Sequence, residues 1–229
     1  MNIKTLGGTL NDVFGNARIK NVPGSNERLS FVKNSFDQIK MNYDIFPAYD
    51  GKKFTNQSLI INHGTFNIGY PSSAGFVGNQ ISTFVILLNE INYYNSNSFM
   101  IFDDDCYFLN FENENNFNSI KDNLPDNWDV IIFGNVEPVI SSSKDYTYKK
   151  VSDWRDCAGS HGIAVNKKVY LDWLYILDGA QYWGDGTIHR LFELGHNIYK
   201  IFPGICAQNR NLFSDINQGF HKDKTGFNK

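Results

Sequence analysis

Three consecutive aspartates, Asp103-Asp104-Asp105, directly follow the short apolar run at residues 98–102. Such a run is typical of a strand buried on both faces, and open α/β sheets bind ligands at the carboxyl ends of these strands. Adjacent carboxylates repel one another, and a hard divalent cation relieves that repulsion. Residues two apart in extended chain point the same way, so Asp103 and Asp105 are predicted to hold Mn²⁺ or Mg²⁺ while Asp104 faces elsewhere. The alternative is a solvated acidic turn.

Asp185 is the candidate for acid–base chemistry. It lies between Gly184 and Gly186, next to Trp183. A carboxylate within reach of a hydroxyl can act as its general base, and an aromatic face offers a sugar an apolar platform. In the alternative interpretation, Asp185 caps the helix that follows.

Turn residues supply further candidates for binding a phosphorylated ligand. Asp50 and Gly51 follow a predicted strand and form either a wall of a nucleoside pocket or an ordinary turn pair. Arg28 can bind a phosphate, although a surface arginine on an amphipathic helix is an equal alternative. Gly78 would let the backbone approach a ligand closely.

A second group of candidates lies later in the chain. Gly159 and His161 precede a predicted strand and could line a bound sugar; a partly buried polar role is the alternative for His161. Ser214 and Asp215 could meet a pyrophosphate or simply form a C-terminal turn.

The elements that must position these residues alternate between strands and helices. Hydrophobic periodicity predicts strands at 17–22, 43–48, 98–102, 128–134, 162–165 and 197–201, with a less regular one at 59–61. It predicts helices at 27–39, 75–92, 117–123, 167–177 and 184–194. Alternation of this kind indicates a single α/β domain with a mostly parallel central sheet.

Composition narrows the class of protein. The 229 residues contain 21 Lys and Arg against 24 Asp and Glu. The chain therefore has no excess of positive charge with which to bind the phosphates of nucleic acid. No apolar stretch is long enough for a transmembrane helix, and the first residues lack a secretory signal. The three cysteines are widely spaced, which argues against a zinc knuckle and predicts free thiols in a reducing compartment.

An ordered set of motifs resembles glycosyltransferase family 25, the lipooligosaccharide and collagen sugar-transferase group. It runs from about Arg18 to Ile216 and covers most of the chain. The motifs that carry the resemblance are Arg28-Leu29, Phe46-x-Ala48-Tyr49-Asp50-Gly51, Gly75-x-x-Gly78-x-x-x-Ser82, Ile101-Phe102-Asp103-Asp104-Asp105, Trp128-Asp129-Val130-Ile131-Ile132-Phe133-Gly134, Gly159-Ser160-His161-Gly162, Asp185, Gln208 and Ser214-Asp215-Ile216.

This resemblance implies a GT-A-like nucleotide-sugar transferase sandwich. It implies a UDP-sugar donor, transfer of a hexose to a glycan, lipid-linked sugar or hydroxylated protein, and inversion at the anomeric carbon. Asp185 then becomes the predicted base and Trp183 the acceptor platform. The donor-binding residues are predicted to be Arg28, Asp50, Gly51, Gly78, Ser82, Asp104, Gly159, His161, Gln208, Ser214 and Asp215.

We therefore expect a loose lead-in at 1–16, a glycosyltransferase domain at 17–213 and a tail at 214–229. The expected location is the cytoplasm of a cell or of a virus-infected host. Thr83 replaces the histidine that the family places after Ser82. This departure supports an alternative function, a non-catalytic nucleotide-sugar or carbohydrate-binding protein on the same fold.

Overall fold

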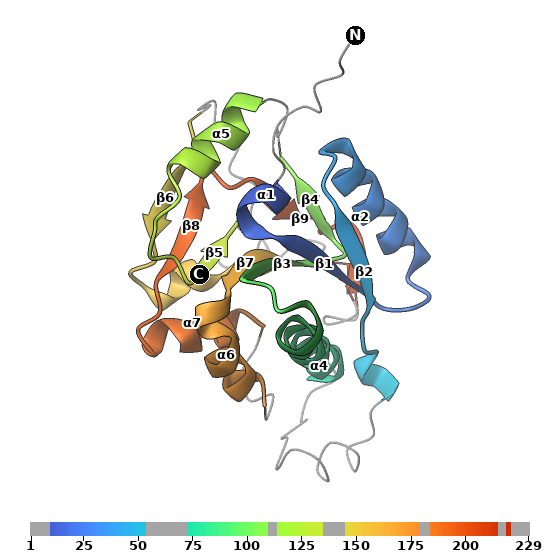
Figure 1. The fold of residues 1–229 in the computed structure, drawn as a ribbon. Coiled ribbons are helices and arrows are strands. Elements are labelled where there is room, and N and C mark those ends of the chain that lie inside the picture. Colours follow the sequence, from blue (N-terminus) through green and yellow to red (C-terminus); the bar gives the residue numbers. More distant parts are fainter. Residues whose placement is uncertain are drawn as a thin grey trace, which may run out of the picture.

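The computed structural model describes residues 10–53, 73–109, 114–134, 145–178, 184–214 and 219–220. Its centre is a seven-stranded mixed sheet covered by helices on both faces (Figure 1). In spatial order the strands are β2 (Tyr43–Pro47), β1 (Asn16–Asn21), β3 (Ser98–Asp103), β7 (Gly162–Asn166), β5 (Val130–Ile132), β8 (Ile198–Phe202) and β6 (Thr147–Lys150).

Five of these seven strands run in one direction, and β7 and β6 run against them. The predicted α/β class with a mostly parallel sheet is therefore confirmed. Two small antiparallel pairs accompany the main sheet: β4 (Cys106–Phe108) with β9 (Cys206–Gln208), and β10 (Phe213–Ser214) with β11 (Gly219–Phe220).

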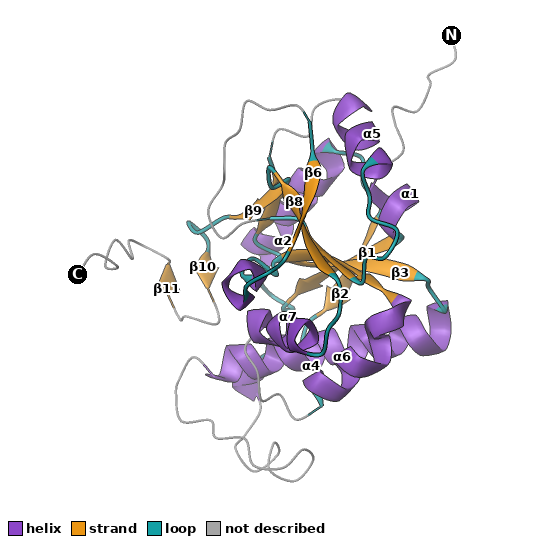
Figure 2. Cartoon of the chain, turned by 90° about the vertical axis from the view of Figure 1, so that its left-hand side faces the viewer, coloured by secondary structure: helices purple, strands orange, loops and turns teal. Residues whose placement is uncertain are grey.

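The helices form two layers, one on each face of the sheet (Figure 2). One layer contains α1 (Leu10–Phe14), α2 (Asn26–Gln38) and α5 (Glu114–Asp122). The other contains α4 (Ser73–Asn89), α6 (Tyr170–Leu177) and α7 (Gly184–Glu193). Short helical turns are η1 (Gly51–Lys53), the π-helix η2 (Glu90–Tyr94), η3 (Trp154–Cys157) and η4 (Lys167–Val169).

Strand β3 shows why both faces of the sheet carry a core. Met100 and Phe102 pack in the hydrophobic cluster under α1, α2 and α5. Phe99 and Ile101 pack in the opposite cluster, under α4, α6 and α7. Alternating side chains of an extended chain thus enter two cores, which is the physical reason for the unbroken apolar run.

The N-terminus differs from the prediction of a loose lead-in up to residue 16. Leu10 and Phe14 of α1 are buried in the core, and Phe14 packs edge-on against Trp128. The folded unit therefore begins before residue 17. One turn of helix carries too little periodicity to be recognised in a Gly- and Asn-rich segment.

Several short elements were also absent from the prediction. They are β4, β6 and β9, together with β10 and β11, which lie at the start of and within the expected tail. Strands of two to four residues have no measurable alternation, so tertiary pairing defines them. Residues 59–61, predicted as a strand, lie outside the described residues. None of the described helices has the length and apolarity to cross a membrane.

Candidate functional site

The candidate site lies where three neighbouring parallel strands end. Lys20 is near the end of β1, Asp103 ends β3, and residues 48–53 follow β2. Backbone pairing brings Lys20 directly opposite Asp103. This is the edge at which open α/β sheets bind ligands, because several loops diverge from it.

A cavity of about 90 Å³ opens at this edge, with room for several water molecules. Helix α2 contributes Arg28 to its wall, α4 contributes Ser82, and β9 contributes Gln208. The full lining consists of Lys20, Val22, Arg28, Ala48, Tyr49, Asp50, Gly51, Lys52, Gly75, Asn79, Ser82, Asp103, Asp104, Asp105 and Gln208. Eight residues predicted to bind metal or donor therefore share one cavity: Arg28, Asp50, Gly51, Ser82, Asp103, Asp104, Asp105 and Gln208.

Asp104 lines the same cavity as its neighbours, so the expectation that it faces elsewhere is wrong. Strand β3 ends at Asp103 and the next two residues form a turn, where the two-residue alternation of a strand no longer holds. Arg28 bridges the two turn carboxylates. Its Nε donates to Asp104 Oδ1 at 2.6 Å, and its Nη2 lies 3.0 Å from Asp105 Oδ2.

Polar neighbours complete the shell around the carboxylates. Asn21 Nδ2 donates to Asp104 Oδ2 at 2.7 Å, and Gln208 Nε2 donates to Asp105 Oδ2 at 2.9 Å. Lys20 Nζ lies 2.8 Å from Asp103 Oδ1. Lys20 was missed from the sequence, because a single lysine in an alternating strand has no distinguishing pattern.

Burial sets the electrostatics of this group. It raises the pKa of Asp104 and Asp105, and the Arg28 guanidinium acts in the opposite direction on both. Burial also tends to lower the pKa of Arg28, but Asp105 and Asp104 more than reverse this and raise it. The three charges thus depend on one another, since each is poorly solvated without its partners.

The carboxylates have the donor atoms that a hard cation requires. Among the described residues, Asp105 Oδ1 is buried and accepts no hydrogen bond. The Asp103 side chain is 25% exposed and borders the cavity. One unsatisfied carboxylate oxygen beside a second, accessible carboxylate fits Mg²⁺ or Mn²⁺, which prefer oxygen ligands.

Gly78 and Ser82 hold the segment that follows β2 against α4. Ser82 Oγ accepts from Tyr49 N at 2.8 Å and donates to Gly78 O at 2.6 Å. A Cβ at position 78 would lie 2.6 Å from Gly51 N, so only glycine permits this approach. Gly78 therefore lies beneath the cavity wall and does not line the cavity.

Asp185 lies apart from the aspartates, in the first turn of α7. It is exposed, and its Oδ1 accepts hydrogen bonds from Ser160 N, at 3.0 Å, and from Ser160 Oγ. Ser160 borders a second, smaller cavity of about 20 Å³, which shares Lys20 and Asn79 with the first. The aspartate cavity and the region of Asp185 are therefore neighbours.

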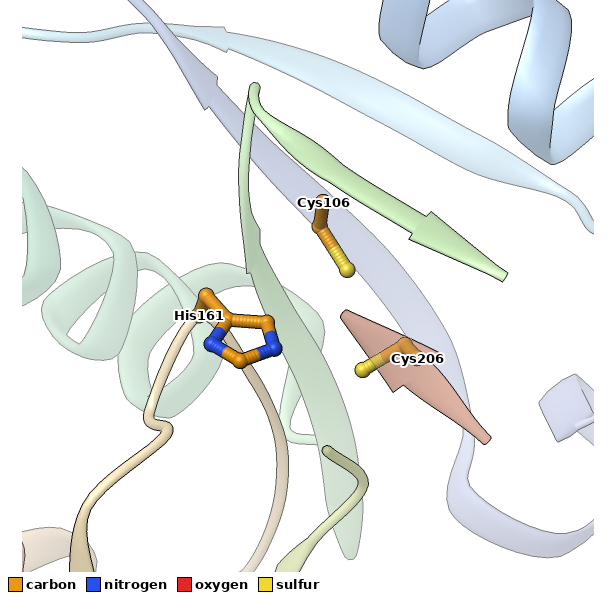
Figure 3. A group of neighbouring side chains, drawn as sticks. All are labelled: Cys106, His161 and Cys206. Carbon is orange, nitrogen blue, oxygen red and sulfur yellow. The ribbon is translucent and has the colours of Figure 1, made fainter. Parts of the chain in front are cut away.

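Gly159 and His161 flank Ser160 but lie inside the fold. Gly159 is buried with φ of 106°, a conformation that favours glycine. The His161 carbonyl accepts from Asp103 N at 2.9 Å. Its ring points into the core, toward Cys106 and Cys206 (Figure 3).

Those three residues form a second cluster, which the sequence did not reveal. The ligand atoms of Cys106, His161 and Cys206 all lie within 4.8 Å of one another, and all three residues are buried. Burial tends to raise the pKa of Cys206, but its interactions with the neighbouring Cys106 and His161 lower it to about 6. The wide spacing of the cysteines was taken above as evidence against a zinc knuckle. The pairing of β4 with β9 nevertheless brings Cys106 and Cys206 close together.

The structure gives little or no information on three of the predicted site residues. Trp183 and Asp215 lie outside the described residues. Ser214 is placed only as the last residue of β10.

Comparisons with known proteins give distant matches. No family model matches the chain, and no curated protein matches it. One solved structure that it resembles is a glycosyltransferase involved in the glycosylation of the major capsid of PBCV-1, at 9% identity and a TM-score of 0.49, covering 89% of this chain and 95% of that one. Another is the inositol-1-phosphate CTP transferase from T. maritima, at 10% identity and a TM-score of 0.45, covering 85% and 88%.

A third is a mutant Drosophila β-1,4-galactosyltransferase 7 in complex with manganese, UDP-Gal and xylobiose. Its identity is 13% and its TM-score 0.42, covering 90% of this chain and 68% of that one. The structural neighbours thus include glycosyltransferases and a nucleotidyltransferase. At these identities and TM-scores they establish neither family nor activity.

Proposed function

We propose that the protein is a metal-dependent glycosyltransferase that moves a hexose from a UDP-sugar to a hydroxyl of a glycan or protein acceptor, with inversion. The observation that carries this proposal is the carboxylate group Asp103–Asp105 at the ends of parallel strands, facing a cavity that basic side chains also line. Membership of glycosyltransferase family 25 remains part of the proposal.

The charge of the cavity favours a diphosphate that arrives with a cation. Among the described lining residues, three are basic (Lys20, Arg28 and Lys52) and four are acidic (Asp50 and Asp103–Asp105). A diphosphate alone would add negative charge beside four carboxylates. A divalent ion compensates for that charge, while the basic residues offer donors to phosphate oxygens.

Asp103 and Asp105 would hold Mn²⁺ or Mg²⁺. When bound there, the ion would supply Lewis-acid neutralisation of the charge on the departing diphosphate. Arg28 positions Asp104 and Asp105 through its two contacts, and Lys20 positions Asp103. The protein thus preorganises the carboxylates before any ligand arrives, which reduces the cost of assembling them.

On the acceptor side we assign the general base to Asp185. Ser160 fixes one carboxylate oxygen, and the exposure of Asp185 leaves it accessible to an acceptor hydroxyl. Asp185 would take the proton of that hydroxyl as its oxygen attacks the anomeric carbon on the face opposite the diphosphate. Lys20 and Asn79 line both the aspartate cavity and the small cavity beside Ser160, which supports a donor side and an adjoining acceptor side.

Thermal stability measured with a panel of nucleotide sugars, each with Mn²⁺ and with EDTA, tests the proposal. A ligand at 100 times its Kd stabilises the folded state by about 2.7 kcal/mol, so we expect a clear Mn²⁺-dependent shift with UDP and one UDP-sugar. Release of UDP from that sugar should follow. A shift without UDP release, with or without acceptors, would favour the non-catalytic binding protein, and no shift with any nucleotide would overturn the proposal.

A matched pair of variants links this result to the site. Asp103→Asn should remove the Mn²⁺-dependent part of the shift. Asp126→Asn should retain it, because Asp126 is exposed and precedes the start of β5, at the edge of the sheet opposite the site.

A further inference from the structure

A group of soft metal ligands lies beneath the aspartate turn. Cys106 begins β4, Cys206 begins β9, and His161 directly precedes β7. Their side chains converge from three segments on one point in the core (Figure 3). Cys106 and Cys206 are fully buried, and His161 is 5% exposed.

The strand register shows that the two thiols are not placed as a disulfide. Within the β4–β9 pair, Cys106 lies opposite Gln208, and Phe108 lies opposite Cys206. The cysteines are therefore diagonal neighbours, whose Cα atoms are typically about 7–8 Å apart. Disulfides usually require about 4.4–6.8 Å. Both cysteines are free in the structure.

Two glycines leave room for the cluster. A Cβ at Gly134 would lie 2.6 Å from His161 Nε2 and 2.9 Å from Cys206 Sγ. A Cβ at Gly162 would also lie 2.9 Å from Cys206 Sγ. The Cβ atom of any other residue at these two positions would clash with the ligand atoms.

The imidazole lacks a conventional partner for its inner nitrogen. His161 Nε2 is buried and makes no hydrogen bond with the described residues. A buried nitrogen without a hydrogen bond destabilises the folded state, so such atoms normally have a water, an ion or another partner. In this cluster the nitrogen faces two sulfur atoms, and all three ligand atoms lie within 4.8 Å of one another.

We propose that Cys106, His161 and Cys206 bind one Zn²⁺ ion at a buried site, separate from the hard-metal site of the carboxylates. Thiolate and imidazole are ligands that zinc prefers, and with three protein ligands the fourth tetrahedral position would go to a water molecule. Two thiolates and a neutral imidazole neutralise the charge of Zn²⁺, which suits a buried position. Cu⁺ with the same ligands would leave a net negative charge in the core.

The ion would join the segments that support the carboxylates. Cys106 follows Asp105 directly, the His161 carbonyl accepts from Asp103 N, and Gln208 donates to Asp105. Because its ligands come from three segments, a bound ion would fix the positions of β4, β9 and the start of β7 relative to one another. Zinc is thus expected to stiffen the base of the aspartate cavity without touching a substrate.

Metal content provides the first test. The protein is produced without a polyhistidine tag in zinc-supplemented medium, desalted under reducing conditions and analysed by atomic emission. We expect about one zinc per chain. A reduced protein that neither retains zinc nor takes up one equivalent on addition would overturn the proposal, as would stoichiometric copper in its place.

Variants locate the ion. Cys106→Ser and Cys206→Ser should each lose most of the zinc, whereas Cys157→Ser should retain it, because Cys157 is buried in the opposite core cluster. Asp103→Asn should also retain zinc, which separates this site from the proposed catalytic metal. Full zinc content in Cys206→Ser would contradict the assignment.

X-ray absorption at the zinc edge keeps the proposal testable even if these variants do not fold, because it uses the unmodified protein. We expect sulfur neighbours at about 2.3 Å and a nitrogen neighbour at about 2.0–2.1 Å. A shell of oxygen and nitrogen alone would place the zinc elsewhere and overturn the proposal. So would alkylation showing that the native protein carries a disulfide between Cys106 and Cys206. None of these readouts depends on transferase activity.

Discussion

The two sides of the turn at residues 103–106 carry different ligand chemistry, although most of their side chains are buried on both sides. On the cavity side, three aspartates face Lys20 and Arg28, and the Asp103 side chain is 25% exposed. On the core side, the next residue, Cys106, faces His161 and Cys206 and is fully buried. The adjacent residues Asp105 and Cys106 therefore separate the hard carboxylate ligands from the soft thiol and imidazole ligands, all three of which can be uncharged.

The difference teaches how a short segment can keep two kinds of ligand apart. Carboxylates remain charged when cations and water are near, and basic residues lie on their side of the turn. Thiols and a neutral imidazole can be buried without a counter-charge, whereas the buried carboxylates of Asp104 and Asp105 require Arg28. We expect the carboxylate side to govern turnover and the thiol side to govern rigidity.

The strongest test of this division is Asp105→Asn. Losing a ligand of the catalytic metal removes several kcal/mol of transition-state stabilisation, so we expect Mn²⁺-dependent transfer to fall by roughly 10³-fold or more. Initial rates at saturating donor measure the effect. Asp126→Asn is the matched control and should retain the full rate. Normal turnover by Asp105→Asn with Mn²⁺ would remove this residue from the metal site.

The same variant should differ little in stability. Burial raises the pKa of Asp105, so the stability that this carboxyl contributes is present at low pH and is lost as the pH rises through its folded pKa. A neutral asparagine removes the charge but also weakens the contact with Arg28. We expect the melting temperature near pH 7 to change by less than about 4 °C, measured without metal.

Arg28→Ala should be the most damaging change to stability on the cavity side. It leaves two buried carboxylates without their cation, and breaking a buried pair in this way costs about 3 kcal/mol or more. Denaturant unfolding measures the loss. Arg155→Ala is the control, because Arg155 forms an exposed ion pair with Asp153 and its removal should cost less than about 1 kcal/mol. Equal losses in the two variants would show that Arg28 does not support the carboxylates.

Asp185→Asn tests whether the acceptor side is separable from the aspartate cavity. Loss of a general base lowers the rate by about 10²-fold, while donor binding should be unchanged because Asp185 does not line the donor cavity. Single-turnover transfer and the UDP-sugar stability shift measure the two effects. A normal transfer rate would exclude Asp185 as the base, and a lost stability shift would place it on the donor side.

Sequence reasoning located the carboxylate side because its evidence is local. The three aspartates are consecutive and follow an apolar run long enough to indicate a buried strand. The class of fold followed from the same periodicity in several segments. Gln208 was placed near the aspartates by resemblance alone, since it is about a hundred residues away and enters the cavity only through β9.

The thiol side had no such local evidence. Cys106 and Cys206 meet because β4 pairs with β9, and these three-residue strands have no periodicity of their own. His161 joins them because β7 runs antiparallel to β3. Pairing across such distances depends on the whole sheet, so a single sequence cannot reveal the cluster.

The smallest expected effect, from Cys206→Ser, decides whether the two sides are truly independent. If zinc only stiffens the base of the cavity, its loss should lower Mn²⁺-saturated transfer by about 10-fold, the low end of the effects seen when groups behind a metal site are removed. Cys157→Ser, at a buried thiol outside the cluster, should leave the rate unchanged. A loss as complete as that of Asp105→Asn would mean that carboxylates and thiols form one catalytic unit. A partial loss, restored by neither excess Mn²⁺ nor excess donor, would instead support two adjoining sites joined by the turn.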